Sequence, residues 1–418
     1  MVNSSPPGRA GLEKNIRLYL PYMMLTSVMP WLSVFYLFFL ERVSMEQAIT
    51  LGAVYYLAVV VFEVPSGYLS DRAGRRPTLM LSALFFLCSY ICFILADGMP
   101  LLLLGEILLA AGIAFQSGSD TSLLYDTLKL LKRDAEYGDR EARAAQYGLI
   151  ALAMSTLVGG IVGVWDLRLA YVVGIIAASF SLVMAFQFTE PVISDDAAIA
   201  ARANGFFSQL KECIRYFANP FLAWILAFYV IGYSLQHVPY EFYQPYIELL
   251  EVNNLFNGLR AGTTSLTSGV LISISMFGGA WGAACSMRLY KRLGLFKLLM
   301  LGLIIICVII AGLGLALHPL ILLLVMFRNF PMAMVQAPML STIAPHISSQ
   351  HRATYLSLQS LAGRLAFSLM MFTLAGISSA TAGASWAGLS ELFRWSLLVG
   401  IVGLLALFVT RRNIEREN

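Results

Sequence analysis

Long apolar stretches alternate with short polar segments from one end of the chain to the other. Each apolar stretch is about 20 residues long, the length that a helix needs to cross the hydrocarbon core of a bilayer. Lipid offers no water to unpaired peptide groups, so such stretches must form helices. The pattern predicts an all-α membrane protein with twelve transmembrane helices. The predicted spans lie near residues 18–40, 47–69, 77–96, 99–125, 145–164, 169–189, 219–246, 263–288, 296–317, 319–344, 352–378 and 392–410.

The longest polar stretch inside this apolar body runs from Glu190 to Asn219 and separates two sets of six spans. We expect an N-terminal six-helix bundle at 1–189, a cytoplasmic linker at 190–218 and a C-terminal six-helix bundle at 219–418. Within the linker, four apolar residues recur at three- and four-residue spacing and predict an amphipathic helix on the inner membrane face. These residues are Phe206, Leu210, Ile214 and Phe217.

The composition supports a membrane protein. Hydrophobic residues make up 59% of the 418 residues and charged residues only 12%, about half the charged fraction of a soluble domain. Of the 28 Lys and Arg residues, 22 fall in the N-terminal segment, in every second connection after it and in the C-terminal segment. This bias predicts that both termini are cytoplasmic and that the protein lies in the cell inner membrane. It also explains the net charge of +4 without a nucleic-acid partner.

Enzyme signatures are missing from the sequence. There is no phosphate-binding Gly-x-x-x-x-Gly-Lys loop, no zinc-ligand spacing and no nucleophile elbow. The five cysteines lie in predicted spans or in the linker, so we expect no disulfide framework and no metal site. We therefore predict neither enzymatic activity nor a cofactor.

One motif after the second span carries a family resemblance. Residues 67–76 read GYLSDRAGRR, which resembles the signature loop of the major facilitator superfamily (Gly-x-Leu-x-Asp-Arg-x-Gly-Arg-Arg) at every defining position. A weaker copy follows the eighth span at 287–294. Shorter family-like strings at 63–67, 117–120, 125–126 and 363–365 resemble the drug and siderophore exporter branches.

The resemblance implies a two-bundle transporter whose cytoplasmic gate depends on this loop. Asp71 can face the positive end of another helix, and Arg75 and Arg76 can pair with carboxylates of neighbouring spans. The family places the acidic partner at the inner end of the fourth span, where Asp120 and Asp126 stand. The expected gate motif comprises Gly67, Asp71, Arg72, Gly74, Arg75, Arg76, Asp120 and Asp126.

Two arginines fall near the membrane midplane. Arg328 lies in the tenth predicted span and Arg364 in the middle of the eleventh. Ionisable groups are costly at that depth, so each is a candidate for binding an anionic substrate group. The guanidinium fork suits carboxylates and phosphates. The alternative is that each arginine forms a buried pair with a protein carboxylate or caps a backbone carbonyl.

Three acids within predicted spans are candidates for carrying a transported proton. Glu106 and Glu241 lie away from the expected gate, and Glu63 lies close to it. A buried carboxylic acid can load and release protons near neutral pH.

Polar and aromatic residues on the first, fourth and seventh spans could line a cavity for an organic, partly polar solute. Some tyrosines could instead belong to the interfacial belt, and His237 could be a packing histidine as well as a proton relay. Together with Arg328 and Arg364, the expected substrate-binding residues are Trp31, Gln116, Tyr229, Tyr233, Gln236 and His237.

These features favour a monomeric secondary transporter that moves a small organic anion or zwitterion, such as a siderophore, drug or metabolite, by alternating access. Export against entering protons is the preferred direction. The alternatives are proton-coupled import, lipid flipping by the same fold, and a transporter-like receptor that binds without moving solute.

Overall fold

The computed structural model describes residues 8–191, 206–252, 264–378 and 386–411, and these residues form helices without a strand. The helices up to residue 191 are α1 (Arg9–Thr26), η1 (Pro30–Ser33), α2 (Phe35–Leu40), α3 (Met45–Ala73), α4 (Arg75–Leu95), α5 (Met99–Gln116), α6 (Ser119–Leu130), η2 (Asp134–Glu136), α7 (Tyr137–Val162) and α8 (Arg168–Gln187). The later helices are α10 (Phe206–Tyr216), α11 (Pro220–Val252), α12 (Thr264–Leu315), η3 (Pro319–Ile321), α13 (Leu322–Met326), α14 (Phe330–Ile343), η4 (Ala344–His346), η5 (Ser349–His351), α15 (Arg352–Ser378) and α16 (Trp386–Val409).

Nine helical segments within the described residues are long and apolar enough to cross a membrane. One of them, Ser268–Leu315, has 48 residues. A straight helix of that length would extend about 72 Å, more than twice the thickness of the hydrocarbon core. The backbone breaks at Gly294, where φ is 74° and ψ is 169°. The segment is therefore two successive helices, which correspond to the predicted ranges 263–288 and 296–317.

Three predicted spans are interrupted in the structure. The range 319–344 divides into η3, α13 and α14, with a turn at 327–329. The range 99–125 divides into α5 and α6 at Ser117 and Gly118, where Gly118 has a φ of 75°. The range 18–40 is interrupted after α1, and Pro30 opens the short helix η1. The predicted spans missed all three breaks, although the polar run 116–122 and Pro30 mark the last two in the sequence.

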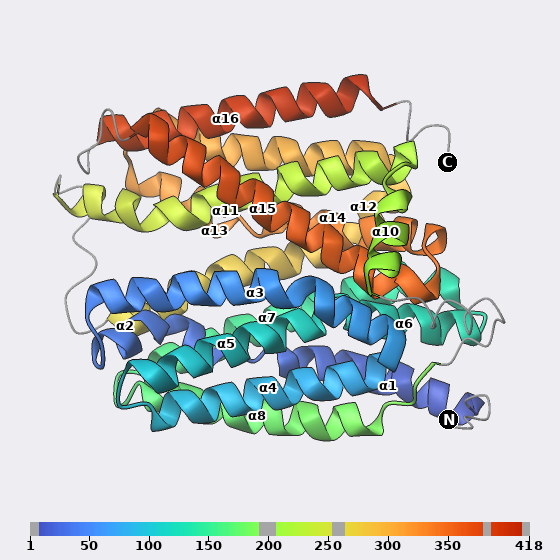
Figure 1. Cartoon of the computed structure of the whole chain (residues 1–418). Coiled ribbons are helices and arrows are strands. Elements are labelled where there is room, and N and C mark those ends of the chain that lie inside the picture. The colour runs from blue at the N-terminus through green and yellow to red at the C-terminus, as the bar shows by residue number, and fades with distance from the viewer. Residues whose placement is uncertain (1–7, 192–205, 253–263, 379–385, 412–418) are drawn as a thin grey trace.

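The helices form two groups that lie side by side (Figure 1). We call α1 to α8 the N-terminal helix group and α11 to α16 the C-terminal helix group. Helix α10 runs across the others at one end of the molecule and lies next to both groups there (Figure 1). Helix α1 begins and α16 ends at that same end, which we call the α10 end.

The two groups meet along α7 and α12, where small residues bring the backbones close together. A Cβ atom added to Gly160 would lie 3.2 Å from the Cα atom of Gly269. The hydroxyl oxygens of Thr156 and Ser273 are 3.1 Å apart and form a buried hydrogen bond between the helices. Close backbone approach and hydroxyl hydrogen bonds are the usual means of helix association in lipid.

Helix α10 is present as predicted, but its buried face differs from the predicted apolar face. Gln209 and Cys213 are buried, whereas Phe207 is 81% exposed and Ile214 is 54% exposed. The sulfur of Cys213 lies 3.8 Å from the carbonyl oxygen of His351 in η5. Contact with the C-terminal helix group therefore decides which face of α10 is covered, and an apolar face stays available to the membrane surface.

The contact between α10 and η5 includes a histidine whose charge would disturb it. The Nδ1 atom of His351 lies 3.2 Å from the Tyr216 hydroxyl and 3.2 Å from the Ser348 hydroxyl. Burial lowers the pKa of His351, and the nearby charge of Glu212 opposes this effect only in part. Burial also raises the pKa of the Cys213 thiol. The docked helix therefore favours a neutral imidazole and a neutral thiol.

A methyl group at position 159 should destabilise the fold. A Cβ atom on Gly159 would lie 1.9 Å from the carbonyl oxygen of Pro30, so η1 and α7 would have to separate. We expect Gly159→Ala to lower the free energy of unfolding by at least about 1–3 kcal/mol. Gly52→Ala is the matched control, because nothing lies within 4 Å of a Cβ atom there. Equal thermal unfolding midpoints for the two variants in detergent would contradict this packing.

Acidification should loosen α10. A histidine whose pKa is lowered on docking binds fewer protons than the undocked form, so docking free energy is lost as the pH falls below the ordinary histidine pKa of about 6.5. The measurement is the hydrogen-exchange rate of residues 206–216 in the wild type, divided by the rate in His351→Gln at the same pH. This ratio should be larger at pH 5.5 than at pH 7.5. If wild type and variant keep the same ratio at both pH values, His351 does not control the docking of α10.

Candidate functional site

The signature loop connects α3 to α4, and its Asp71 lies at the first turn of α15. The carboxylate of Asp71 accepts hydrogen bonds from the backbone N–H groups of Ala353 at 3.2 Å and Thr354 at 2.8 Å. It also accepts one from the Thr354 hydroxyl at 2.7 Å. The first N–H groups of a helix lack intrahelical partners and carry partial positive charge. Asp71, from the N-terminal group, therefore caps a helix of the C-terminal group.

Arg75 joins two carboxylates. Its guanidinium lies 3.1 Å from Asp71 and 3.2 Å from Asp126 of α6. It also donates to the carbonyl oxygen of Ser70 at 2.8 Å and to that of Ser349, which precedes α15. One arginine thus holds the signature loop, the end of the fourth predicted span and the C-terminal group together.

Arg352 completes this arrangement from the C-terminal group. It pairs with Asp126 and donates to the carbonyl oxygens of Ala344 at 3.3 Å and Ile347 at 2.9 Å. Its guanidinium stacks over the ring of Tyr125 at 4.1 Å. The sequence analysis missed Arg352 because it stands out only as one basic residue of an inner segment. We call the following four residues the gate cluster: Asp71, Arg75, Asp126 and Arg352.

The gate cluster is buried and electrically balanced. Each of its side chains is at most 6% exposed, and two carboxylates face two guanidinium groups. The linker adds a further contact, because the amide of Gln209 in α10 donates to Asp71 at 3.2 Å. The same amide donates to Thr354 at 3.0 Å and to the carbonyl oxygen of Gln350 at 3.1 Å. Three parts of the chain therefore meet around Asp71.

Other residues of the expected gate motif lie beside this cluster. Arg72 donates to the Tyr68 hydroxyl, and Arg76 donates to the carbonyl oxygen of Phe186 at 2.9 Å. Within the described residues, neither arginine forms an ion pair. Both hold the loop locally to the N-terminal group.

Asp120 and Gly67 also have separate positions. Asp120 is buried and accepts a hydrogen bond from the backbone N–H of Thr121 at 2.7 Å. Of the two candidate acids, it is therefore Asp126 that reaches Arg75. A Cβ atom on Gly67 would lie 2.6 Å from the Ser357 hydroxyl oxygen, so the absence of a side chain lets α3 and α15 touch.

Glu190 closes the loop from the other side. Its carboxylate accepts hydrogen bonds from the backbone N–H groups of Arg75 and Arg76, both at 2.8 Å. Gly74 has a φ of 114°, and a Cβ atom there would lie 2.8 Å from the Glu190 carboxyl group. Burial raises the pKa of Glu190, although Arg75 and the two N–H groups favour its ionised form. Gly74 thus provides both the turn and the room that this cap of α4 requires.

Deeper in the molecule, Arg364 of α15 faces Glu63 of α3. The Nε atom of Arg364 lies 3.8 Å from Oε2 of Glu63, and the side chains are 21% and 0% exposed. The other oxygen of Glu63 accepts a hydrogen bond from the Ser117 hydroxyl at 3.0 Å. The structure thus brings Arg364 and Glu63 together across the two groups, which is one of the two alternatives that the sequence left open.

A row of aromatic rings from α11 lies next to Arg364. Tyr229, Tyr233 and His237 follow at four-residue spacing, with ring centroids 5.8 Å and 4.1 Å apart. The ring of Phe367 on α15 lies 5.1 Å from that of His237. A Cβ atom on Gly363 would lie 2.9 Å from the ring of Tyr229 and 3.1 Å from that of Tyr233. Gly363 therefore lets α15 pack on this row and sets its neighbour Arg364 beside the rings.

Arg328 and Gln236 belong to a second polar group. Arg328 precedes α14, donates to the Ser275 hydroxyl at 3.1 Å and stacks over the Tyr240 ring at 4.5 Å. Gln236 donates to Asn329 at 3.2 Å, and Asn329 donates to Ser275 at 3.0 Å. This network ties α11, α12 and the α13–α14 connection together within the C-terminal group.

Trp31 and Gln116 lie in the N-terminal group. The indole N–H of Trp31 donates to the Tyr90 hydroxyl at 3.1 Å, and its ring packs in the core of that group. The amide of Gln116 donates to the Thr26 hydroxyl at 2.9 Å. Their contacts bring them together with neither Arg328 nor Arg364.

The two other candidate proton carriers stand apart from the arginines. Glu106 lies in α5 and is 5% exposed. Within the described residues it forms no ion pair. Glu241 lies in α11, and its side chain is outside the described part of the chain. Glu106 is thus a buried acid inside the N-terminal group.

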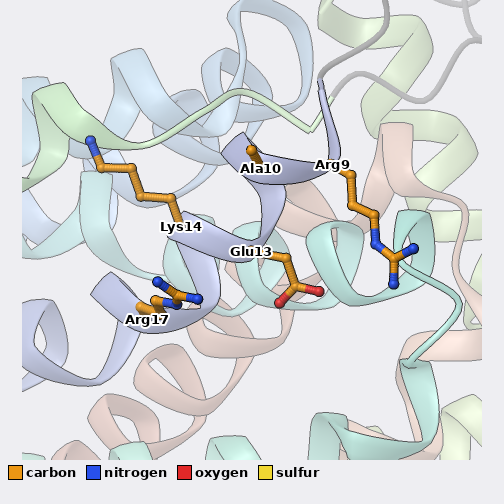
Figure 2. A pocket seen from close by; sticks show the side chains of 5 residues that line it. All are labelled: Arg9, Ala10, Glu13, Lys14 and Arg17. Atoms are coloured by element: carbon orange, nitrogen blue, oxygen red, sulfur yellow. The ribbon is translucent and has the colours of Figure 1, made fainter.

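Two hollows lie at the α10 end, away from Arg328 and Arg364. Figure 2 shows the first, whose lining side chains all come from the first turns of α1. Because a single helix forms it, it is a surface depression, and Glu13 at its edge pairs with Arg133 at 3.1 Å. The second lies between α10 and the segment before α15. It is lined by Glu212, Arg215, Tyr216, Asn219, Leu222, His346 and His351.

Comparisons with known proteins agree with this architecture. A crystal structure of the fucose:proton symporter of E. coli superposes with a TM-score of 0.67 over 94% of this chain and 98% of that one, at 14% sequence identity. The class D tetracycline resistance protein of Salmonella ordonez is 30% identical over 145 residues, which are 34% of this chain and 35% of that protein. Sugar transport protein 2 of Arabidopsis thaliana is 40% identical over 70 residues, 17% of this chain and 14% of that protein. The chain thus spans about a third or less of the length of these two relatives.

The sequence model of the Major Facilitator Superfamily matches residues 18–371, most of the chain. This match confirms the resemblance that the signature loop indicated, and the fold of the fucose symporter agrees with it. The chain belongs to the Major Facilitator Superfamily.

Proposed function

We propose that the protein is a secondary transporter that works by alternating access between its two helix groups. The observation that carries this proposal is the gate cluster, which joins the groups through buried charges at one end only of α3 and α15. In this proposal the structure represents the state closed at the α10 end. In the same proposal, the protein consists of a six-helix bundle at 1–189, a linker at 190–218 and a six-helix bundle at 219–418, with twelve spans in all.

The distribution of basic residues gives this state an orientation. The signature loop, α10 and the first turn of α15 carry Lys and Arg residues, and positively charged connections stay in the cytoplasm. We therefore assign the α10 end, with both termini, to the cytoplasmic side of the inner membrane. The closed gate then faces the cytoplasm.

The energetics of the gate cluster suit a switch. Removing four charged groups from water is costly, and their mutual attraction with additional hydrogen bonds roughly offsets this cost. When the groups separate at this end, water can solvate every charge again. The closed and open states can therefore differ by only a few kcal/mol, which is the range in which a substrate or a proton can shift the balance.

The proposed substrate is a small organic anion or zwitterion, such as a siderophore, drug or metabolite, exported against entering protons. Arg364 is the reason for proposing a negatively charged group on the substrate. Within the described residues, the only carboxylate paired with Arg364 is that of Glu63, and it lies 3.8 Å away. The similarity to a tetracycline resistance protein favours export within this proposal. Proton-coupled import, lipid flipping and a non-transporting receptor are the competing functions.

Proton movement in liposomes distinguishes proton-coupled export, proton-coupled import and a non-transporting receptor. Protein is reconstituted with a pH-sensitive dye inside, and tetracycline, L-fucose and 2-naphthoate are added in turn at equal pH on both sides. Antiport moves protons opposite to the solute, symport moves them with it, and a receptor moves none. A response to fucose alone would contradict an anionic or zwitterionic substrate.

Loss of one charge in the gate cluster should open the α10 end. In Asp71→Asn the charge that faces Arg75 and the first turn of α15 is gone, and breaking a buried pair costs about 3–5 kcal/mol. The buried Cys213, which packs at this end, should then react with maleimide at least about tenfold faster. Peptide mass spectrometry resolves Cys213 from the other cysteines. The control is Asp97→Asn at an exposed position, and equal labelling of the two variants would exclude a latch at Asp71.

Neutralising a buried acid away from the gate should uncouple transport from protons. We expect Glu106→Gln to abolish solute accumulation driven by a pH gradient while leaving solute exchange at equal pH intact. The Glu241→Gln variant is measured beside it, and the exposed Glu41→Gln is the control. If both buried-acid variants still concentrate the solute, another group carries the proton or the coupling ion is not a proton.

A further inference from the structure

Resting on the proposed transport function, we propose that the substrate is an aromatic carboxylate. It binds Arg364 in place of Glu63 and lays its rings against the row formed by Tyr229, Tyr233 and His237.

The first observation is the incomplete pairing between Arg364 and Glu63. At 3.8 Å the facing atoms attract each other but are too far apart for a hydrogen bond. Within the described residues, Nε of Arg364 and Oε2 of Glu63 are buried and have no hydrogen-bond partner. Most buried polar atoms in proteins are hydrogen-bonded, so this pair, which is one of several exceptions within the described residues, calls for an explanation. A ligand carboxylate could satisfy the guanidinium in two-pronged geometry, which Glu63 does not reach.

The second observation is how Glu63 is held. Its other oxygen is bound by the Ser117 hydroxyl at 3.0 Å, at the break between α5 and α6 in the N-terminal group. Glu63 therefore belongs to one group and Arg364 to the other, and no rigid element within one group keeps the two together. An anion that binds Arg364 therefore competes with Glu63 for the guanidinium.

The third observation is the aromatic row beside Arg364. The ring planes of Tyr229 and Tyr233 are inclined by 31°, and those of Tyr233 and His237 by 33°. All three side chains, and Arg364 itself, are half-buried, so other protein groups do not cover them completely. Rings of a ligand could stack on these faces and edges in the offset geometry that aromatic pairs prefer. A guanidinium next to a stacking surface selects a molecule that carries an anion on a ring.

Arg328 is less suited to this role. It already donates to Ser275 and stacks on the Tyr240 ring, and its network lies within the C-terminal group. Binding an anion there would disrupt a connected hydrogen-bond network, whereas binding at Arg364 completes one. The structure therefore favours Arg364 over Arg328 as the anion-binding residue.

The test is equilibrium binding of matched probes to the purified full chain by titration calorimetry. The probes are 2-naphthoate, its amide 2-naphthamide, and cyclohexanecarboxylate, which keeps the charge and lacks the aromatic ring. We expect 2-naphthoate to bind at least about tenfold more tightly than either comparison compound, because only it uses both the guanidinium and the rings. Equal binding of naphthoate and naphthamide, or no binding of naphthoate up to millimolar concentration, would overturn the inference.

Variants separate the contributions of the residues. Arg364→Ala should weaken naphthoate binding by at least about tenfold, and Arg364→Lys should restore it only in part. Glu63→Gln should strengthen binding several-fold, because the competing anion is removed. The control is Glu141→Gln, which neutralises a buried acid that is hydrogen-bonded to Tyr19 at 3.0 Å. Naphthoate binding that is weaker in Glu63→Gln than in this control would contradict competition at Arg364.

The Tyr233→Leu variant tests the contribution of the aromatic row separately from that of Arg364. It should reduce the affinity for 2-naphthoate and leave that for cyclohexanecarboxylate unchanged. These experiments measure binding and not transport, so a lack of naphthoate binding would not contradict the proposed role of the gate cluster. If Asp71→Asn still exposes Cys213 while no aromatic carboxylate binds, the substrate class is wrong and alternating access stands.

Discussion

The structure depends on four buried charges that must neutralise one another. Asp71, Arg75, Asp126 and Arg352 come from both helix groups, and none of them could remain ionised at this depth without the others. Because the partners lie on different groups, their attraction holds the two groups together at the α10 end. Their arrangement also accounts for nearby features, including the carboxylate cap on α15 and the glycine contact between α3 and α15.

The same two helices carry the gate cluster and the candidate binding residues. On α3, Glu63 precedes Asp71 by two helical turns, a distance of about 12 Å along the axis. On α15, Arg364 follows Thr354 at a similar spacing. Separation of α3 and α15 at the α10 end must therefore change the distance between Glu63 and Arg364. In our proposal this shared pair of helices links the occupancy of Arg364 to the state of the gate.

The sequence predicted the helical architecture well, because lipid leaves long apolar segments no other regular structure. It missed the break at Gly118, which lies in the polar run 116–122, and the break after α1, which Pro30 follows. The family resemblance pointed to Asp71, Arg75 and Asp126, but a single sequence cannot show which distant residue meets them. Arg352 and the amide of Gln209 became visible only once the chain was folded. Likewise, charge and predicted depth singled out Arg328 and Arg364, whereas their surroundings required coordinates.

The central claim is that opening at the α10 end and closing at the opposite end are one motion. Pulsed electron resonance distances between spin labels on exposed residues measure both ends, with the native cysteines replaced. One pair is placed at Lys129 and Arg288 near the α10 end, and the other at Asp97 and Leu320 at the opposite end. We predict that Asp71→Asn lengthens the first distance and shortens the second. Unchanged distances, or lengthening of both, would contradict alternating access controlled by the gate cluster.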